Sequence, residues 1–134
     1  MEQQDLNLEK LKRISALLIH AAKIDEEYTE KEKQIILNFL NNFTKDDKIK
    51  EKILTDAELL ESDSNQILNF TNSIKKDSLD SKSIVIKELW KIIISNNETD
   101  KYESNLMRRI CGLIYFPDKL SGEIKLKLID ELKD

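Results

Sequence analysis

The sequence is poor in the residues that interrupt helices. Its 134 residues include only 2 Gly and 1 Pro, and aromatic residues make up 6% of the chain. Long stretches therefore run without a helix breaker, and the abundant Leu, Ile, Lys and Glu residues favour helices. This composition predicts an all-α fold and makes a sheet-based architecture a minority expectation.

The sequence also lacks an apolar run that is long enough to span a membrane. Its most apolar segment, 84–94, carries Lys87, Glu88 and Lys91, and it falls well short of the ~20 residues that a span requires. The first residues, 1–5, are polar and acidic, unlike the basic start and apolar stretch of a secretory signal. We therefore expect a cytoplasmic protein without a transmembrane segment.

An excess of positive charge is missing as well. Lys and Arg number 22 against 26 Asp and Glu, so the formal net charge is -4, and the sequence pI is about 5.2. A surface that neutralises phosphates is not expected from this balance, which disfavours nucleic acid as the main partner. We expect a protein partner instead, and the sequence does not identify it.

Apolar residues recur at spacings of three and four, which is the periodicity of amphipathic helices. The predicted helices cover 6–24, 29–43, 44–61, 67–76, 84–96, 100–114 and a last segment that begins after Pro117 or at Ser121. The polar run 77–81 is predicted to be a loop, and the β-branched residues of 84–94 leave a strand as the second alternative there. We expect a compact bundle of about seven helices that forms a single domain over 1–134.

Two parts of the chain resemble each other. One shift of the sequence against itself places Leu18 on Leu89, Asp25 on Asn96 and Glu32 on Glu103. The order of an apolar helix, an acidic or amide-rich loop and a Glu in the next helix recurs in both parts. The sequence therefore predicts two repeated helix–acidic loop–helix hairpins, over about 6–43 and 82–116.

Residues that often carry catalysis are scarce. The only cysteine, Cys111, lies among apolar residues, which predicts a buried thiol that packs as a small hydrophobe. The only histidine, His20, pairs in the repeat with Lys91, which indicates a solvated position. We expect a structural or surface histidine, because metal binding and acid–base catalysis normally need a second convergent group and the sequence identifies none. Trp90 is predicted to be a packing anchor. We expect no catalytic residue and no enzymatic activity.

Acidic residues gather in the first predicted loop, where five carboxylates fall between positions 25 and 32. Oxygen ligands at this density suit hard cations such as Ca²⁺, Mg²⁺ or Mn²⁺. The EF-hand template does not match, because Glu30 stands where it needs Gly. The alternative is helix capping alone: Thr29 and Glu32 match a capping box, and first-turn carboxylates stabilise a helix by ~0.3–1 kcal/mol each without a ligand.

The two loops resemble those of the TerB-like proteins, the tellurite-resistance TerB family and its relatives. In that family a helix leads twice into the pattern Ala-Asp-Gly-x-hydrophobic-(Ser/Asp)-x-x-Glu, and positions 25–32 and 96–103 occupy it here. Glu26 and Asn97 depart from the pattern because they replace its glycines. Asn96 replaces an Asp, so the second loop has one fewer anionic ligand and should bind a cation more weakly.

The resemblance implies an all-helical accessory or binding module of a bacterial stress-response system, with a divalent cation in its acidic loops and no other cofactor. The predicted ligands are Asp25, Glu27, Glu32, Asn96, Glu98 and Glu103. The alternative function is a metal-independent helical adaptor that binds a partner protein. A metallohydrolase ranks last, because the sequence offers carboxylates alone.

Overall fold

The computed structural model describes residues 8–23, 29–63, 68–72, 74–94 and 101–132. The helices are α1 (Leu8–Lys23), α2 (Glu30–Leu40), α3 (Asp47–Asp63), α4 (Leu68–Thr71), α5 (Leu79–Ile94), α6 (Lys101–Leu113) and α7 (Asp118–Leu132). The residues so described contain no strand, which confirms the all-α class. Segment 84–94 is helical, and the alternative of a strand there is wrong. None of the described helices combines the length and the apolar character of a membrane span.

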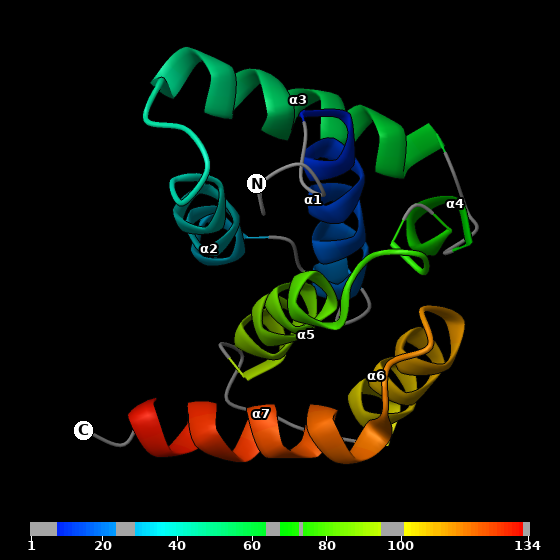
Figure 1. The fold of residues 1–134 in the computed structure, drawn as a ribbon. Helices are drawn as coiled ribbons and strands as arrows, with labels where there is room; N and C mark the ends of the chain where they lie inside the picture. The colour runs from blue at the N-terminus through cyan, green and yellow to red at the C-terminus, as the bar shows by residue number, and fades with distance from the viewer. Residues whose placement is uncertain (1–7, 24–28, 64–67, 73, 95–100, 133–134) are drawn as a thin grey trace.

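Two helices, α1 and α5, occupy the middle of the fold (Figure 1). In this view α3 crosses above α1, and α7 runs below α5. Helix α1 packs against α3 and α5, and α5 also packs against α7. Helix α2 lies on one side of this stack, whereas α4 and α6 lie on the other. The central helices therefore have neighbours on several faces.

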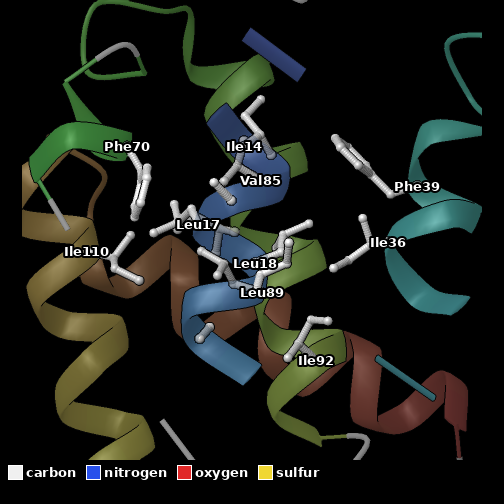
Figure 2. Close-up of a cluster of buried hydrophobic side chains, with 14 of the residues drawn as sticks. Ile14, Leu17, Leu18, Ile36, Phe39, Phe70, Val85, Leu89, Ile92 and Ile110 are labelled. Atoms are coloured by element: carbon white, nitrogen blue, oxygen red, sulfur yellow. The ribbon is translucent and has the colours of Figure 1, made fainter. Parts of the chain in front are cut away.

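The buried side chains form one core to which every helix contributes. Figure 2 shows part of this core, around α1 and α5. Helix α1 is its centre, since Ile14, Leu17 and Leu18 are fully buried. Phe39 from α2 and Leu89 from α5 meet this helix from different directions. Burying an aliphatic or aromatic side chain of this size contributes roughly 1.5–3 kcal/mol. The apolar faces that the three–four spacing predicts are thus the faces that pack inward.

The predicted loop 77–81 is wrong, because α5 begins at Leu79 inside it. The Ser78 hydroxyl accepts a hydrogen bond from the backbone N–H of Ser81 at 3.2 Å, which is how a serine caps a helix. A polar run therefore serves as a cap and a first helical turn. Similarly, the Asp46 carboxylate accepts the N–H of Lys48 at 2.9 Å just before α3.

Two other predicted boundaries shift. Helix α7 begins at Asp118, since the Ser121 N–H already donates to the Pro117 carbonyl at 3.1 Å; a start at Ser121 is wrong. The predicted fourth helix, 67–76, is a single turn of 4 residues at Leu68–Thr71. The count of about seven helices depends on whether this turn is included, so it stays a prediction.

The predicted repeat and the single domain also stay predictions. The loops of both hairpins fall within 24–28 and 95–100, outside the described residues. Positions that the repeat pairs do agree in burial: Leu18 and Leu89 are buried, as are Leu40 and Cys111. This agreement is what a duplicated hairpin requires, although any two amphipathic helices in one core would give it.

Candidate functional site

The acidic segment ends in a formed helix cap. Thr29 precedes α2 with extended backbone angles (φ -99°, ψ 177°), and Glu32 lies three residues further on. The Glu32 Oε1 atom accepts a hydrogen bond from the Thr29 backbone N–H at 2.9 Å and another from the Thr29 hydroxyl. The predicted capping box is confirmed.

Glu32 is more than a surface cap, because only 1% of the residue is exposed. Burying a carboxylate is costly unless hydrogen bonds replace its lost water. The two donors of Thr29 supply part of this replacement, and the positive end of α2 favours the negative charge. Glu32 is therefore a carboxyl group held in one position where the acidic segment meets the core.

The side chains of the other predicted cation ligands lie outside the described part of the structure. Asp25, Glu27, Asn96 and Glu98 lie outside the described residues, and Glu103 belongs to α6 at a position whose side chain is not described. Among the described residues, no group of three or more His, Cys, Asp or Glu side chains is arranged to hold a metal ion. The cation site over these residues stays a prediction.

A second polar cluster joins α1 to α3, and it was not predicted from the sequence. Lys23 Nζ donates to Glu61 Oε1 at 2.7 Å, and His20 Nδ1 lies 3.3 Å from Glu61 Oε2. Glu61 is 8% exposed. The His20 ring also packs near Phe70 of α4, with 6.2 Å between the ring centroids. His20 is therefore a half-buried structural histidine that meets Glu61, which agrees with the expectation of a structural or surface residue, although the position is less solvated than its pairing with Lys91 indicated.

A local signal for Glu61 existed. Ile53, Ala57 and Glu61 follow one another at steps of four on α3, so Glu61 continues an apolar stripe. A carboxylate at such a position implies a cationic partner on the facing helix. The identity of that partner could not be read from the stripe, because His20 and Lys23 are about forty positions away.

A third buried polar contact lies between α5 and α7. Trp90 Nε1 donates to Ser121 Oγ at 3.0 Å, and Lys125 Nζ lies 4.9 Å from the centroid of the Trp90 ring system. Cys111 is buried beside this contact, and desolvation raises the pKa of its thiol. A hydrogen bond with Ser121 lowers this pKa, and the nearby Asp118 carboxylate raises it further. The predictions that Trp90 and Cys111 pack inside are confirmed.

These features define an all-α protein with two enclosed central helices and a buried carboxylate at the end of an acidic helix connection. The chain belongs to the TerB family: the family model described as tellurite resistance protein TerB matches residues 12–126. The resemblance seen in the loop pattern is thereby confirmed. Comparison with curated proteins gives no match, and comparison with solved structures gives none either.

Proposed function

We propose that this protein is a non-enzymatic binding module of a bacterial stress-response system of the tellurite-resistance kind. In this proposal the helix connection of each hairpin holds a divalent cation. The first site uses Asp25, Glu27 and Glu32, and the second uses Asn96, Glu98 and Glu103. Membership of the TerB family supports the assignment to such a system.

The observation that carries the proposal is the position of Glu32. This buried carboxylate is the last of the densest run of acidic residues in the chain. Ca²⁺, Mg²⁺ and Mn²⁺ prefer oxygen ligands, and a preordered carboxylate lowers the entropy cost of collecting the others around an ion. Because Thr29 holds Glu32 Oε1, Glu32 would act as the fixed member of the first site.

Thermal unfolding with Ca²⁺ or Mn²⁺ tests this function. Free cation at about a hundred times its dissociation constant should stabilise the fold by ~2.7 kcal/mol. Asp25→Asn should remove most of this gain, and Asn96→Ala should remove less because the second loop has one fewer anionic ligand. Asp25 is a better target than Glu32, since Glu32→Gln also weakens the cap of α2.

The matched control is Glu30→Gln, which removes an exposed first-turn carboxylate outside the proposed ligand set. It should retain the full stabilisation by the cation. A parallel titration with NaCl at equal ionic strength measures the relief of repulsion among crowded carboxylates. The cation proposal fails if NaCl stabilises equally or if Asp25→Asn responds like the wild type.

A groove between α5 and α7 favours a second candidate, the metal-independent adaptor. Ile84 is 38% exposed and, with Ile124 and Leu128, lines a cavity of about 250 Å³. Two lysines, Lys87 and Lys127, and one carboxylate, Glu131, also border it, so the charged lining is net positive. This pattern suits a partner helix with an apolar face and a neighbouring acidic flank.

Fluorescence anisotropy tests this candidate. A labelled Leu- and Glu-rich amphipathic peptide should bind to the protein in excess EDTA. Lys87→Glu combined with Lys127→Glu should abolish that binding, and binding that survives the charge reversal would contradict it.

A further inference from the structure

A separate cavity of about 260 Å³ lies where α5, α6 and α7 meet. Trp90 lines it from α5, Arg108 from α6, and Asp118, Ser121 and Lys125 from α7. None of these residues belongs to the proposed cation site. Its lining combines cationic, aromatic and hydroxyl groups, which distinguishes it from the apolar groove between α5 and α7.

The charges around this cavity favour an anion. Arg108 and Lys125 both line it, against a single carboxylate from Asp118, so the lining carries a net positive charge. Neither Arg108 nor Lys125 forms an ion pair with a carboxylate in the part of the chain that the structure describes. In contrast, α1 contributes Lys10, Lys12 and Arg13 to ion pairs. Asp118 and Ser121 belong to the first turn of α7, whose positive end adds to the field.

Existing contacts hold one wall of the cavity in place. The hydrogen bond from Trp90 Nε1 to Ser121 Oγ fixes the indole plane, and the attraction between a cation and an aromatic face holds the Lys125 ammonium over it. Gly122 also borders the cavity, and a Cβ atom placed there would meet no atom within 4 Å. The position that a side chain would occupy at Gly122 is therefore open space. A ligand would find a partly preorganised site.

We propose that this cavity binds a small oxyanion, the carboxylate or phosphate group of a small molecule, between the Arg108 guanidinium and the Lys125 ammonium. A guanidinium presents a planar fork of donors that matches the oxygens of either group. The ligand is small, because pockets for drug-sized molecules usually measure roughly 300–1,000 Å³. The Trp90 indole supplies an apolar surface beside the anionic group.

The experiment uses Trp90, the only tryptophan of the chain, as its reporter. The full-length protein is titrated with inorganic phosphate and, separately, with acetate, in a buffer stripped of divalent cations by a chelating resin and at constant ionic strength. We expect a saturable change in Trp90 fluorescence and a matching isotherm by calorimetry. Arg108→Gln and Lys125→Gln should each weaken binding by about tenfold or more, because each removes a charged hydrogen-bond donor.

Arg109→Gln is the matched control. Arg109 is exposed like Arg108 and is its neighbour in α6, but it does not line the cavity, so the variant should bind as the wild type does. Saturable binding of phosphate alone assigns a phosphate group, and binding of both anions assigns any oxyanion. A response that does not saturate, that NaCl reproduces, or that Arg108→Gln leaves unchanged overturns the proposal. Because divalent cations are absent, this result is independent of the proposed cation site.

Discussion

At the scale of single residues, Glu61 is the buried charge that ties α1 to α3. Its partners are only partly screened from water, since the side chain of His20 is 22% exposed and that of Lys23 is 45% exposed. Allowing for this exposure, Glu61→Gln should lower the free energy of unfolding by about 1–2 kcal/mol. Urea denaturation measures the change, and a double-mutant cycle with Lys23→Met isolates the ion pair.

Glu58→Gln provides the control for Glu61. Glu58 lies on the same helix and pairs with Lys33 at 3.7 Å, but its side chain is 33% exposed. Exposed pairs of this kind contribute about 0–1 kcal/mol, so the cost should be clearly smaller than for Glu61. Equal costs for the two variants would mean that burial of Glu61 adds nothing.

Cys111 should make the free energy of unfolding fall as the pH rises in the alkaline range. Because burial raises the pKa of its thiol, the folded protein holds this proton more tightly than the unfolded chain does. That contribution is complete below the ordinary thiol pKa of about 8.5 and is lost as the pH rises through the raised pKa of the folded state. The urea midpoint should therefore fall with rising pH above about 8.5, and it should fall less steeply in Cys111→Ala. Parallel pH profiles would contradict the assignment to Cys111.

Tyr115 adopts a left-handed backbone conformation just after α6, with φ of 59°. The Phe116 N–H donates to the Cys111 carbonyl at 2.8 Å, which is the bond of a Schellman motif that normally places Gly at the left-handed position. Tyr115 is 70% exposed, and its ring contacts the Lys75 ammonium, which lies 5.9 Å from the centroid and contributes little at an exposed site. Tyr115→Gly should therefore raise stability by about 0.5–1 kcal/mol. Thermal unfolding measures this gain. Tyr115→Ala retains the strained Cβ and should show none.

At the scale of elements, the start of α2 depends on the Thr29–Glu32 cap. Thr29→Ala should cost ~1 kcal/mol in excess EDTA, because the side chain that pairs with Glu32 is lost. Thr29→Ser keeps the hydroxyl and should cost much less. Denaturant midpoints of the three proteins test this; an unchanged midpoint for Thr29→Ala would show that the cap does not stabilise the fold.

At the scale of the whole molecule, the single core links every helix. A chain whose helices share one core should unfold in one cooperative step. Far-UV circular dichroism follows all helices, whereas fluorescence follows Trp90, which lies in α5 and bonds to α7. We expect coincident transitions by the two probes. Separate midpoints would contradict the prediction of one domain over 1–134.

The helical elements were largely predictable because their causes are local. Three–four spacing places apolar side chains on one face of a helix, and Thr29 with Glu32 are near enough in sequence to form a cap without help from the rest of the chain. The start of α5 was missed for a local reason too. Ser78 and its polar neighbours suit a loop and a helix cap equally well, and only the packing of α5 decides between them.

The sequence by itself determined the all-α class, the inward faces of the helices, the cap at Thr29 and the family, since each depends on residues a few positions apart or on a loop pattern. Tertiary structure alone decided that Glu61 meets His20 and Lys23, and that Arg108 and Lys125 border one cavity with Trp90. The physical reason is distance along the chain. Periodicity shows which face of a helix is buried, but the residue that it meets depends on how the helices cross.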